Sequence, residues 1–102
     1  MAFDGVPAYA FTPEGIKEGA PDTSGIYAIF TPTHWVLIAG ADNMRQALFR
    51  LLDVPTACME SYHPLSFSCE DVPPAERPAH LGALIRNLRP RCNASREPRD
   101  EA

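Results

Sequence analysis

The chain has 102 residues, enough for one small domain, and 45% of them are hydrophobic, which excludes a wholly disordered chain. The formal net charge of -4 disfavours a general binder of nucleic acid. No apolar run approaches the roughly 18 residues of a membrane span, and no signal peptide is recognisable, so we expect a cytoplasmic protein without membrane contact.

The charge is distributed unevenly along the chain. Residues 1–85 are strongly acidic, whereas the basic side chains of residues 86–102 are all arginines: Arg86, Arg89, Arg91, Arg96 and Arg99. Binding to phosphates needs cationic side chains, and this short end supplies most of them. We interpret it as a solubilising tail, with a nucleic-acid patch at Arg86, Arg89 and Arg91 as the alternative.

The cysteines are Cys58, Cys69 and Cys92. Their number is odd, and no pair has a C-x-x-C spacing. This pattern favours reduced thiols in a reducing compartment over a disulfide framework. It also argues against a zinc site built with His63 or His80.

The first half of the chain predicts one short helix and two strands. Residues 1–12 form an irregular arm, and Thr12-Pro13-Glu14 is typical of a helix start, with Gly19 ending the helix. The apolar runs 25–30 and 35–39 are rich in branched and aromatic residues, as buried strands are. Because a short turn joins them, they predict an antiparallel hairpin.

The second half predicts two helices around a third strand. A stripe of apolar residues predicts a helix over 43–52, capped by Asp42. Residues 56–64 form a loop, and the alternation over 65–70 predicts a half-exposed strand. Leu81, Leu84, Ile85 and Leu88 then lie on one face of a last helix, which Pro90 ends.

This order predicts an α+β fold: a small three-stranded antiparallel sheet flanked by helices. We expect an N-terminal arm and short helix over 1–20, one domain over 21–93, and a disordered tail over 94–102, which lacks apolar residues other than alanine.

Three segments of the chain carry a family resemblance. They are Asp22-Thr23-Ser24-Gly25-Ile26-Tyr27, Asp42-Asn43-Met44-Arg45, and Leu84-Ile85 followed by Arg89-Pro90-Arg91-Cys92-Asn93. In this order and spacing they resemble the GIY-YIG endonuclease superfamily, including its small stand-alone bacterial members. The resemblance covers roughly residues 21–93 and implies the same element order.

The resemblance also implies a catalytic site, which this sequence keeps only in part. In the family, two strand tyrosines act on the attacking water, a helix arginine stabilises the phosphate, and a glutamate holds one divalent metal. Here the first tyrosine is Tyr27, but the other positions fall on Leu37, Ala47 and Leu81. An alanine cannot neutralise a phosphate and a leucine cannot bind a metal.

We therefore expect a degenerate, catalytically inactive domain that acts as a binding or regulatory module. Its expected partner is an unidentified protein, with nucleic acid as a possibility through Arg86, Arg89, Arg91 and Asn93. We expect no cofactor. The alternative is an endonuclease with a relocated site, in which Tyr27 and Arg50 are catalytic and Glu70 binds Mg²⁺ or Mn²⁺. For Asn93 itself we favour a structural role over contact with a ligand: its amide ties the chain end to the sheet.

Overall fold

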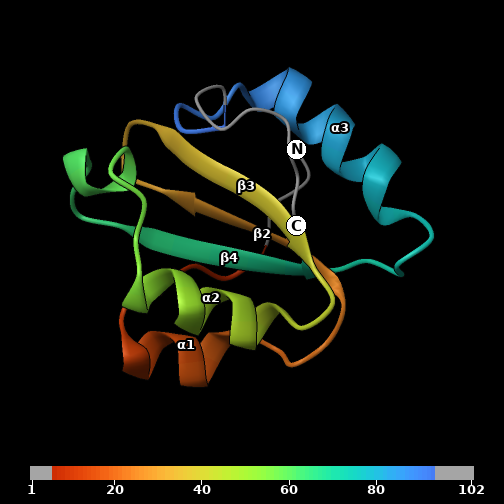
Figure 1. The fold of residues 1–102 in the computed structure, drawn as a ribbon, viewed down its shortest axis with the longest axis horizontal. Coiled ribbons are helices and arrows are strands. Elements are labelled where there is room, and N and C mark those ends of the chain that lie inside the picture. Colours follow the sequence, from red (N-terminus) through yellow and green to blue (C-terminus); the bar gives the residue numbers. More distant parts are fainter. Residues whose placement is uncertain (1–5, 94–102) are drawn as a thin grey trace.

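The computed structural model describes residues 6–93, so the predicted tail over 94–102 lies outside the described residues. The elements follow one another as β1 (Tyr9–Ala10), α1 (Pro13–Gly19), β2 (Gly25–Phe30), β3 (Trp35–Ala41), α2 (Met44–Asp53), the 3₁₀ helix η1 (Met59–Ser61), β4 (Ser66–Asp71) and α3 (Arg77–Leu88) (Figure 1). Among residues 6–93, none of the helices is long and apolar enough to cross a membrane.

The sheet is antiparallel with the strand order β1-β4-β2-β3, so the predicted sheet of three strands was one strand short. The missed strand, β1, pairs Tyr9 with Phe67 and Ala10 with Ser66. The Tyr9 ring stacks on Phe67 at 5.8 Å between ring centres. A strand of two residues has no alternation that a sequence pattern could reveal, and its position depends on this pairing with a distant strand.

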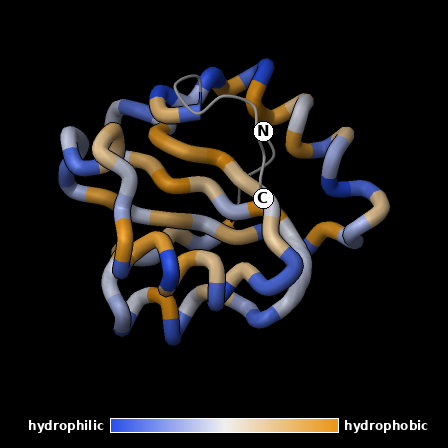
Figure 2. The backbone as a smooth tube through the Cα atoms, in the orientation of Figure 1, coloured by the Kyte–Doolittle hydropathy of each residue, from blue (hydrophilic) through white to orange (hydrophobic). Residues whose placement is uncertain are grey.

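Helices cover both faces of the sheet, with α1 and α2 on one face and α3 on the other (Figure 1). Strand β2 is therefore buried on both sides: Tyr27 and Ile29 pack toward α1 and α2, whereas Ile26 and Ala28 pack toward α3. Figure 2 shows the hydrophobic residues gathered along the central strands and hydrophilic ones in the surrounding loops. The two apolar cores explain why both hairpin strands are continuous apolar runs.

Short side chains fix the starts of the first two helices. The Thr12 hydroxyl accepts a hydrogen bond from the Gly15 N–H at 3.0 Å, which confirms the predicted cap of α1. The predicted cap of α2 was wrong by one residue: Asn43, not Asp42, accepts from the Gln46 N–H at 3.0 Å. Asp42 binds Arg77 instead, because its carboxylate points toward the start of α3.

The last helix ends where the sequence predicts, but the chain after it unexpectedly packs along a strand of the sheet. Arg89 adopts the left-handed conformation at φ 50°, and its N–H caps the helix by donating to the Ile85 carbonyl. Residues 91–93, here called the C-terminal strap, then run along the outer edge of β3. The Arg91 N–H donates to the Trp35 carbonyl at 2.9 Å, and the Cys92 N–H to the Val36 carbonyl at 2.7 Å.

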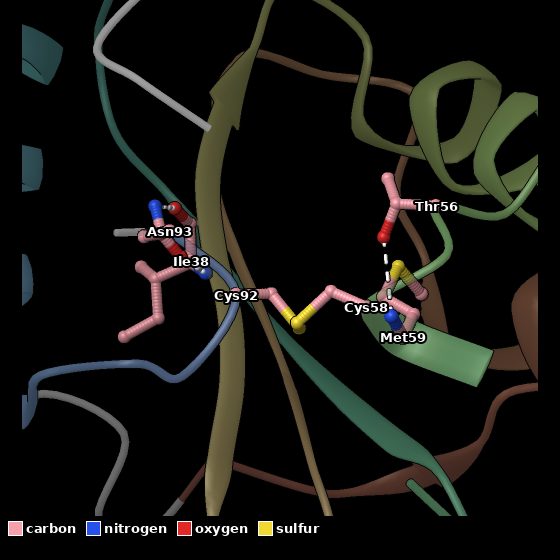
Figure 3. Close-up of a disulfide and its surroundings, with 6 residues drawn as sticks. All are labelled: Ile38, Thr56, Cys58, Met59, Cys92 and Asn93. Atoms are coloured by element: carbon pink, nitrogen blue, oxygen red, sulfur yellow. Dashed lines mark hydrogen bonds between the residues drawn. A yellow bond between two sulfur atoms is a disulfide. The ribbon is translucent and has the colours of Figure 1, made fainter. Parts of the chain in front are cut away.

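The strap is joined to the loop after α2 by a disulfide between Cys58 and Cys92 (Figure 3). The prediction of reduced thiols at these positions was wrong. The two Cα atoms lie 5.7 Å apart, within the usual range for a bridge, although the residues are 34 apart in the chain. The fold brings the two cysteines together, so their spacing in the sequence does not predict the disulfide.

Candidate functional site

The positions where the resemblance expects catalytic groups carry hydrocarbon and are packed into the cores. Leu37 on β3 is 3% exposed, and Ala47 on α2 packs against the same cluster. Leu81 on α3 packs against the opposite cluster, next to Leu84. Tyr27 keeps its tyrosine but is 7% exposed. The residues present therefore do not fit a metal at the family's position.

The relocated site proposed from the sequence also has its members on different sides of the sheet. In the pairing of β2 with β4, Tyr27 lies opposite Cys69, and Ile26 lies opposite Glu70. Paired residues point to the same face, so Tyr27 points toward α1 and α2 while Glu70 points toward α3. Arg50 is an exposed residue of α2, on the Tyr27 side. The structure does not bring these three side chains into one cleft.

Glu70 has a different neighbour, His80 on α3. The Glu70 Oε1 and His80 Nε2 atoms lie 3.5 Å apart, and neither has a hydrogen-bond partner among the described residues. Both atoms are buried although their side chains are partly exposed. The contact is an ion pair whenever His80 is protonated. Residues 6–93 contain no group of three histidine, cysteine or acidic side chains that could hold a metal.

A polar cluster at one end of the sheet was not predicted from the sequence. Arg77, the first residue of α3, donates through Nη1 to the Ser24 hydroxyl at 3.1 Å and to Asp42 Oδ1 at 2.8 Å. Ser24 in turn donates to the Val72 carbonyl at 2.7 Å. The Arg77 side chain also lies against Gly40, where a Cβ would be 3.5 Å from it. The cluster fastens the start of α3 to the loops around β2.

No sequence signal marks this cluster. Arg77 is 53 residues from Ser24 and 35 from Asp42, so no local spacing relates them. The arginine also has its charge already paired with Asp42, which leaves it poorly placed to receive a phosphate. We therefore assign the cluster a structural role: it holds the start of α3 against the loops around β2.

Three exposed arginines lie around the end of α3. Arg86, Arg89 and Arg91 are all exposed, and none of them forms an ion pair within residues 6–93. Arg89 and Arg91 use their backbone N–H groups for the helix cap and for β3, which leaves the side chains to solvent. The sequence predicted these three as the alternative nucleic-acid patch, and their exposure is compatible with it.

Asn93 lies beside Ile38 and bonds it twice (Figure 3). Its Oδ1 accepts from the Ile38 N–H at 2.9 Å, and its Nδ2 donates to the Ile38 carbonyl at 2.8 Å. This confirms the predicted structural use of the Asn93 amide, which ties the chain end to the sheet. These two bonds fix the orientation of the amide and use one acceptor and one donor position of it.

The fold matches solved structures of a nuclease domain. The crystal structure of the GIY-YIG N-terminal endonuclease domain of UvrC from Thermotoga maritima, bound to its catalytic divalent cation magnesium, matches with a TM-score of 0.61. The two are 21% identical, and the match covers 76% of this chain and 93% of that one. An Asn-to-Ala point mutant of the same domain matches equally, with a TM-score of 0.61, 21% identity and coverages of 76% and 92%.

No family model and no curated protein matches the chain. The likeness to the solved structures therefore rests on the fold. This chain has the GIY-YIG fold, as its sequence motifs predict.

Proposed function

We propose that this chain is a catalytically inactive domain with the GIY-YIG fold that acts as a binding or regulatory module in the cytoplasm, with a protein as its partner. The observation that carries the proposal is the packing of Leu37, Ala47 and Leu81 into the two cores. Restoring a charged group at Leu37, which is 3% exposed, would bury it against hydrocarbon at a cost that a compensating charge or metal would have to offset. Ala47 and Leu81 are partly buried, and neither can neutralise a phosphate or bind a metal.

The placement of the remaining polar groups supports the same proposal. An endonuclease needs groups for the attacking water, the phosphate and the metal in one cleft. Here the sheet separates Tyr27 from Glu70, and Arg77 is already paired with Asp42. A protein surface places no such demand on the geometry. It requires a stable scaffold, and the two apolar cores provide that.

A nicking assay tests the loss of catalysis. Purified protein is incubated with supercoiled plasmid in Mg²⁺ or Mn²⁺, and we expect no conversion above that of a mock preparation. The contradicting result is metal-dependent nicking that Tyr27→Phe abolishes. Tyr62→Phe is the matched control, because Tyr62 is another partly buried tyrosine of the same core and occupies none of the family's catalytic positions. Activity lost equally in both variants would point to instability and not to a role for Tyr27.

The exposure of Arg86, Arg89 and Arg91 favours one second candidate function, non-catalytic binding of nucleic acid. Binding through these residues would weaken steeply as salt rises. Fluorescence anisotropy with short single-stranded and duplex DNA and with RNA at low salt tests it. Replacement of all three arginines by alanine should abolish binding, while Arg50→Ala, an exposed arginine of α2, should leave it unchanged. Absence of binding to every probe removes this candidate.

A further inference from the structure

The outer edge of β3 would be an open sheet edge without the C-terminal strap. The strap and β3 share four hydrogen bonds: two from the strap backbone to Trp35 and Val36, and two between the Asn93 amide and Ile38. At the opposite side of the sheet the outermost strand, β1, is two residues long and pairs with Ser66 and Phe67 of β4. Short edge strands are one of the ways in which proteins prevent pairing between chains.

Strand β3 itself has one irregularity, a register shift against β2 that leaves Val36 without a paired residue, and its pairing is regular from Leu37 to Ala41. Its seven residues, Trp35–Ala41, include no proline and no charged side chain. Proline, lysine or an inward charge would discourage pairing with another chain, so over the regular part of β3 the strap is the cover that the described residues provide. Removing the strap would leave an uncovered apolar edge of ordinary strand length.

Ile38 marks the centre of this edge. It presents both its N–H and its carbonyl outward, and the Asn93 amide binds both. A residue that exchanges both bonds with one partner is the hydrogen-bonded pair of an antiparallel ladder. The Asn93 side chain therefore imitates a residue of a neighbouring antiparallel strand. Ile38 is also the middle residue of β3, so two copies of β3 can pair around it with equal overlap on both sides.

The disulfide holds the strap in place. Cys92 is 1% exposed, whereas Cys58 lies in the loop after α2 and is partly exposed (Figure 3). Without the bridge, the strap would be retained by its hydrogen bonds and the packing of Cys92, against the entropy of ordering a chain end. Cys58 is the more exposed of the two residues, so we expect a reductant to attack there.

We propose that a dithiol reductant opens this edge and that a second copy of the chain then occupies it through antiparallel pairing of β3 with β3, centred on Ile38. A thiolate of the reductant attacks Sγ of Cys58, the bond between the two cysteines breaks, and Cys92 leaves as a thiolate that takes up a proton. The second thiol of the reductant resolves the mixed disulfide. The dithiol gives up two electrons and two protons, and the protein gains two thiols.

A second copy fits this edge because the pairing is self-complementary. A two-fold axis at Ile38 places Val36 of one copy opposite Gly40 of the other, and the same edge serves both copies, as in an isologous dimer. The inference goes beyond the proposed function and holds whether or not the domain cuts DNA, since neither Tyr27 nor Glu70 takes part.

The experiment measures molar mass and amide exchange with and without dithiothreitol. Oxidised protein should sediment as a monomer at all concentrations, and reduced protein should double its mass as concentration rises. In dilute reduced protein the Ile38 amide should exchange at least tenfold faster than in oxidised protein, and concentration should restore its protection. The Cys58→Ala, Cys92→Ala double variant should dimerise without reductant.

Controls separate this dimer from other causes. Cys69→Ala keeps the bridge and removes the free thiol, so it should respond to dithiothreitol as the unmodified chain does, which excludes a cross-link through Cys69. A reduced protein that stays monomeric, with the Ile38 amide fully protected, would show that the strap does not open. A reduced monomer with rapid exchange at Ile38 would equally overturn the proposal, because the open edge would not be recruiting a second copy.

Discussion

Cys69 on β4 is the free cysteine of the described chain, and its surroundings keep it protonated. Burial, and after it the negative charge of Asp71, raises the pKa of the thiol from 9.0 to about 12. In the unfolded chain the thiol ionises near its ordinary value, so between pH 9 and 12 the unfolded state has lost this proton while the folded state keeps it. The contribution of Cys69 to stability is therefore full below pH 9 and falls as pH rises.

This predicts a pH dependence that Cys69→Ala removes. The free energy of unfolding of the unmodified chain should fall more steeply between pH 8 and pH 11 than that of the variant. Urea denaturation at several pH values measures both curves, and the difference between them isolates the contribution of Cys69. Parallel curves would mean that the folded thiol ionises normally.

Asn93 gives a second prediction at the scale of one residue. Asn93→Ala removes both hydrogen bonds to Ile38 and leaves its N–H and carbonyl without that partner, so the free energy of unfolding should fall by about 1–3 kcal/mol. Asn87→Ala, at an exposed position of α3, is the matched control and should change it by less than about 0.5 kcal/mol. Equal effects in the two variants would contradict a specific role for the Asn93 amide.

Among the elements, the central hairpin and the two longer helices were the most predictable from sequence. Strands β2 and β3 are continuous apolar runs, and the apolar stripe beginning at Met44 repeats at helical spacing. The sequence did not predict strand β1, because this strand forms by pairing with Phe67, which is distant in the chain. The same reason explains the site: Leu37, Ala47 and Leu81 were found by motif spacing, whereas Arg77 depends on partners that only the fold brings close.

At the start of α2, we expect the adjacent residues Asn43 and Asp42 to contribute differently to stability. Asn43→Ala removes the acceptor for the Gln46 N–H and should lower the free energy of unfolding by about 1 kcal/mol. Asp42→Ala removes an ion pair whose carboxylate is 88% exposed, so it should cost less, within about 0–1 kcal/mol. Chemical denaturation of both variants makes the comparison. A larger loss in Asp42→Ala would mean that Asp42 is the effective cap.

Across the whole molecule, the sheet divides the interior into two cores, and the disulfide adds a covalent link around one edge of it. The bridge joins the loop after α2 to the strap on β3, across 34 residues that contain β4 and α3. Its main effect is expected in the unfolded chain, where it forbids extended conformations.

We expect Cys58→Ser combined with Cys92→Ser to lower the free energy of unfolding by about 2–4 kcal/mol, as the length of the closed loop implies. Denaturation of dilute protein, below any concentration at which it associates, measures the loss. The unmodified chain in dithiothreitol should lose a similar amount, which would separate the bond itself from the effect of the serine hydroxyls. An unchanged denaturation midpoint in both would show that the bridge contributes nothing to stability.

The same covalent link determines how the molecule would respond to mechanical tension. A force applied at the two chain ends follows the shortest covalent path, and in the oxidised protein that path crosses directly from Cys58 to Cys92. Strand β4 and helix α3 lie within the bypassed segment and bear no load. In single-molecule stretching, the oxidised protein should release roughly 110–120 Å less length than the reduced protein, at about 3.3–3.6 Å per hidden residue.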